Sequence, residues 1–154
     1  RWLRERDLVP SAEIKGFSMI GADPALPPLS ADLAVSLLLR DKGLFYSDLD
    51  AFEYNEAFAV ISADFRKKHK NVADRLNRWG GALAYGHPYG ASGAEIMIHL
   101  MKILEKEDGN LGVAAIPAAG GVGEAVLIHH VDEREWTEER ERHTAFSIPL
   151  EVKL

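Results

Sequence analysis

The residue types best suited to chemistry gather around one histidine, His87, in the tripeptide Gly86-His87-Pro88. Proline fixes its own φ and restricts the residue before it, so this sequence favours a rigid turn that holds His87. A helical pattern begins at about Ala91, and the free N–H groups of a helix N-terminus favour negative charge. We therefore expect His87 to meet developing negative charge. A glycine-rich loop with an incidental histidine is the alternative.

A second cluster, Glu-Tyr-Asn-Glu-Ala-Phe-Ala, occupies residues 53–59, where a predicted strand passes into a predicted helix. Open α/β sheets place their sites at the carboxyl ends of strands. The amide of Asn55 offers both donors and an acceptor, so it can hold a water or a carbonyl group. Capping of the following helix is the competing role for Asn55, and the two roles can coexist.

A third cluster, residues 112–125, combines an apolar run with several glycines. These glycines do not indicate a dinucleotide loop, because no helix follows and the third glycine of that fingerprint is missing. Metal ligation is not predicted either. Glu95 and His99 lie four residues apart on a predicted helix, but His99 is expected to pack in the core. His129 and His130 should point to opposite faces of a strand.

The composition is that of a soluble globular domain. The 154 residues are 47% hydrophobic and 27% charged, which suits one domain with its own core. A net charge of −6 argues against nucleic acid or an anionic membrane as the main partner. No apolar run approaches the roughly 18 residues of a membrane span and no signal peptide is visible, which favours a cytoplasmic location. The absence of cysteine excludes disulfides, thiolate metal sites and a cysteine nucleophile within this chain.

Hydrophobic periodicity predicts strands that alternate with helices, and hence an α/β fold in which helices cover a layered sheet. Strands are expected at residues 12–20, 49–54, 112–116 and 124–130, with a final one at 146–152. Helices are expected at residues 30–42, 56–69 and 91–107. Ser30 should cap the first helix at its start and Gly43 at its end. The last helix is expected to be buried on two sides.

All three clusters, in this order and spacing, resemble the C-terminal half of a thiolase, the acetyl-CoA acetyltransferase family. The family's Asn-Glu-Ala-Phe box matches residues 55–58. Its long signature Asn-x-x-Gly-Gly-x-x-x-x-Gly-His-Pro-x-Gly-x-Ser/Thr-Gly is met at each fixed position of residues 77–93. The resemblance implies a thiolase-like layered half, βαβαβαββ, with a mixed five-stranded sheet. It implies a thiolase C-terminal domain at residues 1–131, with its core at about 12–131, and a charged tail or extra element at 132–154.

The resemblance also implies roles for single residues. In the family, the Gly-His-Pro histidine activates a nucleophilic cysteine of the first half and helps form an oxyanion hole, in which the asparagine holds a water. Carried over, these roles fall to His87 and Asn55. The family's acid/base cysteine, in Cys-x-Gly/Ala-x-Gly-x-Gly, is replaced by Pro117, which has no titratable proton. The backbone N–H that lines the second oxyanion hole falls at Ala119.

The function implied is the half of a thiolase-type acyltransferase that supplies the histidine and asparagine side of the site. Acyl-CoA and acetoacetyl-CoA thioesters are the expected substrates, with coenzyme A as substrate and no permanently bound cofactor. The expected partners are the thiolase N-terminal half, from the same gene or a separate subunit, and further copies in a homo-oligomer. Because Pro117 impairs proton transfer, two alternatives stay open: acyl transfer without the Claisen step, and a non-catalytic interaction subunit.

Overall fold

The computed structural model describes residues 2–134 and 136–138, and the chain divides into two compact units. The smaller unit comprises residues 1–11 and 131–154. Within it Arg4–Arg6 form a 3-10 helix, η1, and residues 133, 134 and 136–138 are helical. The strand expected at 146–152 lies outside the described residues. Among the described helices, none combines the length and the apolar character needed to cross a membrane.

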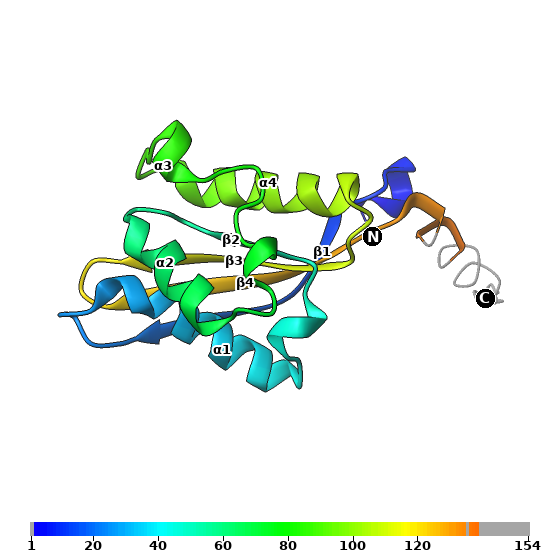
Figure 1. Cartoon of the computed structure of the whole chain (residues 1–154). Helices are drawn as coiled ribbons and strands as arrows, with labels where there is room; N and C mark the ends of the chain where they lie inside the picture. Colours follow the sequence, from blue (N-terminus) through cyan, green and yellow to red (C-terminus); the bar gives the residue numbers. More distant parts are fainter. Residues whose placement is uncertain (1, 135, 139–154) are drawn as a thin grey trace, which may run out of the picture. The chain divides into compact units, whose positions relative to one another are not determined.

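The larger unit, Ala12–His130, is built on a mixed sheet of four strands in the order β1-β4-β3-β2 (Figure 1). The strands are β1 Ala12–Gly21, β2 Ala51–Tyr54, β3 Leu111–Ala118 and β4 Val122–His130. β2 and β3 are parallel, whereas β4 is antiparallel to both of its neighbours. The predicted α/β fold with a mixed sheet is confirmed, although the described residues form four strands and not five.

The side chain of Asn77 pairs with the outer edge of β2, where a further strand could otherwise pair. Leu76 makes one isolated parallel bridge to Phe52, and Asn77 then turns the chain away with φ at 45°. The Asn77 N–H donates to the carbonyl of Phe52 at 2.8 Å. Its side chain continues the ladder, because Oδ1 accepts from the Tyr54 N–H and Nδ2 donates to the Tyr54 carbonyl, both at 2.9 Å. One amide therefore satisfies both backbone groups of Tyr54 at this edge of the sheet.

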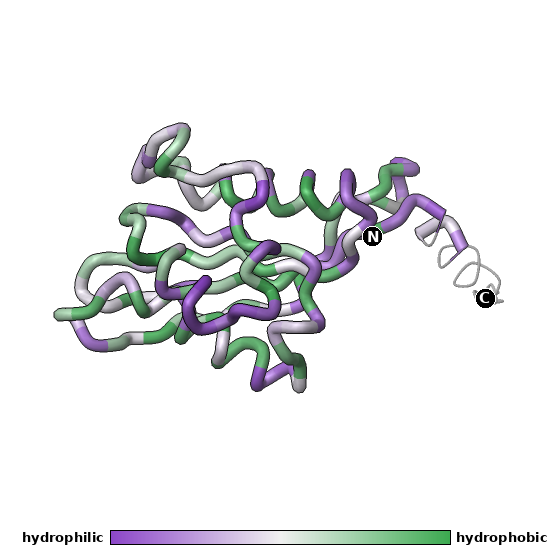
Figure 2. The backbone as a smooth tube through the Cα atoms, viewed as in Figure 1, coloured by the Kyte–Doolittle hydropathy of each residue, from purple (hydrophilic) through white to green (hydrophobic). Residues whose placement is uncertain are grey.

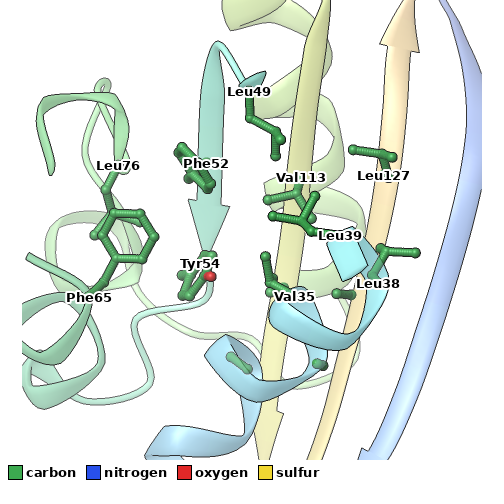
Figure 3. Close-up of a cluster of buried hydrophobic side chains, with 14 of the residues drawn as sticks. Val35, Leu38, Leu39, Leu49, Phe52, Tyr54, Phe65, Leu76, Val113 and Leu127 are labelled. Carbon is green, nitrogen blue, oxygen red and sulfur yellow. The ribbon is translucent and has the colours of Figure 1, made fainter. Parts of the chain in front are cut away.

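Two helices, α1 Ser30–Lys42 and α2 Ala59–Lys68, cover one face of the sheet. Alternate strand residues face them, so the rings of Phe52 and Tyr54 each lie 5.0 Å from the ring of Phe65 on α2. Figure 3 shows this core, to which α1, β3 and β4 contribute aliphatic side chains. They include Val35, Leu38, Leu39, Val113 and Leu127.

A buried polar cluster joins α1 to the end of α2 on this face. The carboxyl group of Asp32 accepts hydrogen bonds from Tyr46 Oη at 2.9 Å and from Tyr54 Oη at 3.1 Å. His69 Nε2 lies 2.9 Å from the same oxygen, and Lys68 Nζ lies 3.6 Å from the other. Asp32 is therefore buried with several partners, which is the condition under which a buried carboxylate is tolerated.

The opposite face is covered by α4, Ser92–Lys106 (Figure 1). Short hydrophobic and hydrophilic stretches alternate along this helix (Figure 2), and its buried residues are Ser92, Ile96, Leu100, Ile103 and Leu104. Ile98 is 53% exposed, so the prediction of burial on two sides is wrong for the described chain. Close packing on β3 requires Gly112, because a Cβ there would meet the Leu100 side chain at 2.6 Å.

The start of α1 differs from the prediction. Ser30 is its first residue and not its cap, since no side chain caps this end. The Ser30 hydroxyl instead has the carbonyl oxygens of Pro27 and Val122 as acceptors, each at 2.7 Å, and so links the helix to β4. Gly43 ends the helix in the left-handed conformation with φ at 68°, as predicted.

The start of α2 also differs, because the chain stays extended past Asn55. The helix begins at Ala59 and its N-cap residue is Phe58, with no side-chain hydrogen bond. Asn55 therefore does not cap α2, and the competing capping role is excluded. A four-residue helix, α3 Ala82–Tyr85, lies between α2 and α4 and was not predicted.

Candidate active site

Four chain segments meet at one cavity of about 830 Å³. Asn55 follows β2 and Pro117 lies near the end of β3, so both come from the carboxyl ends of parallel strands. His87 comes from the loop between α3 and α4. Ala119 completes the four residues singled out from the sequence, all of which line this cavity. The remaining lining residues are Pro27, Pro28, Ala57, Phe58, Ile61, Tyr89, Ile116 and Ala118.

The imidazole of His87 is oriented by the first residue of α4. Its Nδ1 lies 2.6 Å from Ser92 Oγ, and the Ser92 hydroxyl donates to the Pro88 carbonyl at 3.1 Å. Because serine has one hydroxyl proton, this network assigns the N–H donor to His87 Nδ1 and leaves Nε2 as an acceptor. Ser92 is 2% exposed, and Tyr89 packs edge-on against the imidazole with ring centroids 4.9 Å apart.

Asn55 is held by its backbone while its side chain lacks partners. Its N–H donates to the Ala115 carbonyl at 2.9 Å, and the residue is 1% exposed. Neither Oδ1 nor Nδ2 has a hydrogen-bond partner. A buried amide left unpaired costs free energy, so this side chain at the cavity wall is suited to hold a water or a carbonyl group.

The end of β3 brings backbone groups to the cavity without a titratable side chain. Pro117 lies opposite Gly123 of β4, and Ala118 is the last residue of the strand. Ala119 begins the turn to β4, in which Gly120 and Gly121 both have φ at 82°. Residues other than glycine rarely adopt this conformation, so the two glycines define the path of the turn beside Ala119.

Sequence reasoning missed Ser92 and much of the apolar wall. Ser92 had a usable signal, because it lies five residues after the histidine at the start of a predicted helix, where serine is favoured. Phe58 and Tyr89, which are 64% and 90% exposed, gave no such signal. Pro27 and Pro28 reach the cavity from the loop before α1, a long-range contact that no local pattern indicates.

The surroundings of His99 differ from the prediction. His99 is 31% exposed and does not pack in the core. Its ring lies 5.1 Å from that of Tyr85 in an edge-on contact. Within the described part of the chain, no three His, Cys, Asp or Glu side chains are grouped in a way that could hold a metal ion.

Comparison with known proteins identifies relatives of this chain. The family model described as the thiolase C-terminal domain matches residues 8–130. The chain is 38% identical to the acetyl-CoA acetyltransferase of Saccharomyces cerevisiae over 130 residues, covering 84% of this chain and 33% of the yeast protein. It is 37% identical to the cytosolic acetyl-CoA acetyltransferase of Rattus norvegicus over 123 residues, covering 80% of this chain and 31% of that enzyme.

Solved structures show the same relationship. The Ascaris suum thiolase Acat5, solved in complex with coenzyme A, superposes with a TM-score of 0.78 at 40% identity, covering 84% of this chain and 33% of that one. Human mitochondrial 3-ketoacyl-CoA thiolase superposes with a TM-score of 0.80 at 33% identity, with the same coverage of 84% and 33%. The chain thus spans about a third of the length of the relatives that it matches.

Proposed function

Because the chain belongs to the thiolase family, as a thiolase C-terminal domain, we propose that it supplies His87 and Asn55 to the active site of a thiolase-type acyltransferase. The substrates are acyl-CoA thioesters such as acetoacetyl-CoA, and coenzyme A is a substrate and not a resident cofactor. A first half, from the same gene or a separate subunit, provides the nucleophilic cysteine. The observation that carries the proposal is the convergence of His87, Asn55, Pro117 and Ala119 on one cavity.

In this proposal His87 acts first as a base and then as a hydrogen-bond donor to the oxyanion, with the same proton on Nε2. The unprotonated Nε2 takes the proton of the cysteine thiol, while Nδ1 remains bonded to Ser92. The resulting imidazolium then donates Nε2–H to the carbonyl oxygen of the thioester as negative charge develops there, and it returns this proton to the coenzyme A thiolate that leaves when the carbon–sulfur bond breaks. Asn55, through a bound water, donates to the same oxygen. Each donor aimed at an oxyanion typically lowers the activation barrier by about 3 kcal/mol.

Pro117 favours one restriction of this activity, which is acyl transfer without a Claisen step. Transfer of an acyl group between thiols needs only the nucleophile and the oxyanion donors. Cleavage of acetoacetyl-CoA also needs an acid to protonate the leaving enolate, and Pro117 cannot supply it. General acid–base catalysis is typically worth about 10² to 10⁴-fold in rate, so the carbon–carbon step is slow in this protein. The backbone N–H of Ala119 remains as an oxyanion donor for that step.

The relatives and the family resemblance also support a proposal for location and assembly. The rat and mouse relatives are cytosolic acetyl-CoA acetyltransferases, which supports a cytoplasmic location for this chain. Assembly into a homo-oligomer rests on the family resemblance. A thiolase-like interaction subunit without catalysis is the competing function, and the experiment below distinguishes it from an acyltransferase.

The first test measures acyl transfer in the assembled protein, with the first half present, as exchange of labelled coenzyme A into acyl-CoA. His87→Ala should lower the exchange rate by at least about 10³-fold, since it removes both the base and an oxyanion donor. Asn55→Ala should lower it by about 10²-fold. Glu105→Gln, a change at an exposed position of α4, is the matched control and should leave exchange unchanged. An exchange rate in His87→Ala equal to that of the native protein would favour the non-catalytic interaction subunit.

A second assay on the same protein follows thiolysis of acetoacetyl-CoA. Native protein should be slow, and Pro117→Cys should raise the rate by about 10²-fold because it restores a titratable group at the end of β3. Rapid thiolysis by the native protein would contradict the restriction to acyl transfer.

A further inference from the structure

A second polar cluster lies on the α4 side of the sheet, and the proposed catalysis makes no use of it. Strand residues alternate between faces, so Glu53 points toward α4 together with Ala51, while Phe52 and Tyr54 face α1. Glu53 has no exposed surface. Neither of its carboxyl oxygens has a hydrogen-bond partner. A fully buried carboxyl group without partners is among the costliest arrangements in a protein.

The groups around Glu53 add further acceptors. His99 Nδ1 lies 3.9 Å from Glu53 Oε2, and Tyr85 Oη lies 3.4 Å from the same His99 nitrogen. Glu95, one turn before His99 on α4, has a buried Oε2 that also lacks a partner. Glu56 lies close enough for its charge to act on Glu53. Glu53, Glu56 and Glu95 form what we call the acidic cluster.

Among the described residues, no lysine or arginine is bonded to a carboxyl group of the acidic cluster. Burial, together with the charge of Glu56, raises the pKa of Glu53 to about 8. Burial, together with the charges of Glu53, Glu95 and Glu56, raises the pKa of Tyr85. Further along α4, Lys102 is engaged with Glu105 at 2.5 Å. The described residues thus place three carboxyl groups around a half-buried tyrosine and histidine without a lysine or arginine bonded to them.

The separation of these acceptors favours a guanidinium group over a metal ion. A metal ion needs ligands that converge on one point, and no such group of three exists among the described residues. A guanidinium group is planar and carries five N–H donors that point in different directions, so it can serve several separated acceptors at once. It also tolerates burial better than an ammonium group, because it is more weakly hydrated.

The surface beside the cluster indicates where such a group comes from. Tyr85 of α3, whose ring contacts His99, is 42% exposed, and Leu83 of α3 and Ile98 of α4 are 59% and 53% exposed, which are large values for apolar and aromatic side chains. The chain covers about a third of its relatives, so a protein of their length has much more polypeptide to cover this side. We propose that the acidic cluster binds an arginine side chain of the first half of the protein, packed against α3 and α4.

This inference rests on the proposed function only for the origin of the arginine. The site itself can be tested with methylguanidinium, the end group of that side chain. Titration of the 154-residue chain at constant ionic strength should shift the imidazole NMR signals of His99 saturably, with half-saturation on the order of 10 mM. Glu53→Gln and Glu95→Gln should each weaken this binding by at least about tenfold. Glu105→Gln, on the outer side of the same helix, should leave it unchanged.

Several outcomes would overturn the assignment. One is a shift of the His99 signals that rises linearly with methylguanidinium concentration and never saturates. Another is saturable binding of equal affinity in Glu53→Gln. Another is saturation with potassium or magnesium chloride in parallel titrations, which would make the cluster a metal site. In the assembled protein, Glu53→Gln and Glu95→Gln should weaken association with the first half by at least about tenfold, and native-like association would also refute the proposal. Loss of acyl exchange in His87→Ala is a separate readout, so either proposal can fail alone.

Discussion

Ser92 is the residue on which the protonation of His87 depends. Its hydroxyl proton is directed to the Pro88 carbonyl, so its oxygen accepts from His87 Nδ1. The base is then Nε2, and the imidazolium formed after proton transfer is stabilised by the same oxygen. A histidine without this partner is free to rotate and to change tautomer, which lowers the fraction of molecules ready to react.

Ser92→Ala should lower kcat for acyl exchange by about 10- to 100-fold, which corresponds to the loss of one hydrogen bond of about 1–3 kcal/mol. KM should stay close to the native value, because Ser92 does not line the cavity. Ser92→Thr keeps the hydroxyl and should restore most of the activity. A native kcat in Ser92→Ala, or a failure of threonine to rescue it, would show that the hydroxyl does not position the imidazole.

The candidate site was largely predictable at the level of residue types. His87 and Asn55 stand in long, specific motifs, and a strand end followed by a helix start is a position where sites form. The unpaired amide of Asn55 was not predictable, because helix capping offered it an equally good local role. The chain instead stays extended as far as Phe58, so the amide is left for the cavity.

Among the elements, Asn77 ends the backbone pairing beside β2. Its left-handed conformation bends the chain away after a single bridge, and its amide pairs with both backbone groups of Tyr54. Asparagine adopts this conformation more readily than most residues. A local hydrophobic pattern does not reveal such a replacement, because it depends on one polar side chain that bonds to another strand.

Asn77→Gly keeps the backbone conformation but leaves the Tyr54 N–H and carbonyl groups without these partners. The free energy of unfolding should fall by about 2–4 kcal/mol. Asn77→Asp should be destabilising to a similar degree, because a carboxylate oxygen would face the Tyr54 carbonyl. Asp108→Gly is the matched control: Asp108 also has a positive φ, 52°, but is exposed. Urea unfolding should place this control within about 0.5 kcal/mol of the native protein, and equal losses in both glycine variants would contradict the hydrogen-bond role.

In the larger unit, two buried carboxyl groups make the free energy of unfolding depend on pH in opposite directions. Burial alone would raise the pKa of Asp32, but the hydrogen bond and charge of His69, with Tyr46 and Lys68, lower it below 3.8. The contribution of Asp32 to stability is therefore present above about pH 3.8 and is lost as the pH falls below it. Burial raises the pKa of Glu53 from 4.5 to about 8, so its contribution is present below pH 4.5 and is lost as pH rises toward 8. The chain alone should be most stable near pH 4 to 5.

The free energy of unfolding of the 154-residue chain should therefore fall between about pH 5 and pH 9, by up to about 4 kcal/mol, since each unit of pKa shift corresponds to about 1.4 kcal/mol. Glu53→Gln removes the titrating group and should flatten most of this decline, whereas Glu105→Gln should not. Urea unfolding at a series of pH values measures both. A decline of the same size in Glu53→Gln would assign the effect to other groups. In the assembled protein, a cation at the acidic cluster should reduce the decline.

The pairing of β1 with β4 has a consequence for how the protein is made. Ala12 lies opposite His130, so the first strand of the larger unit has its partner at the far end of that unit. While the ribosome synthesises the intervening residues, β1 remains unpaired. Its side chains Ile14, Phe17 and Met19, which are still largely exposed in the folded chain, are then available for unwanted association. Because such distant pairings close slowly, completion of the sheet should be the late step of folding, and nascent β1 the segment that chaperones bind.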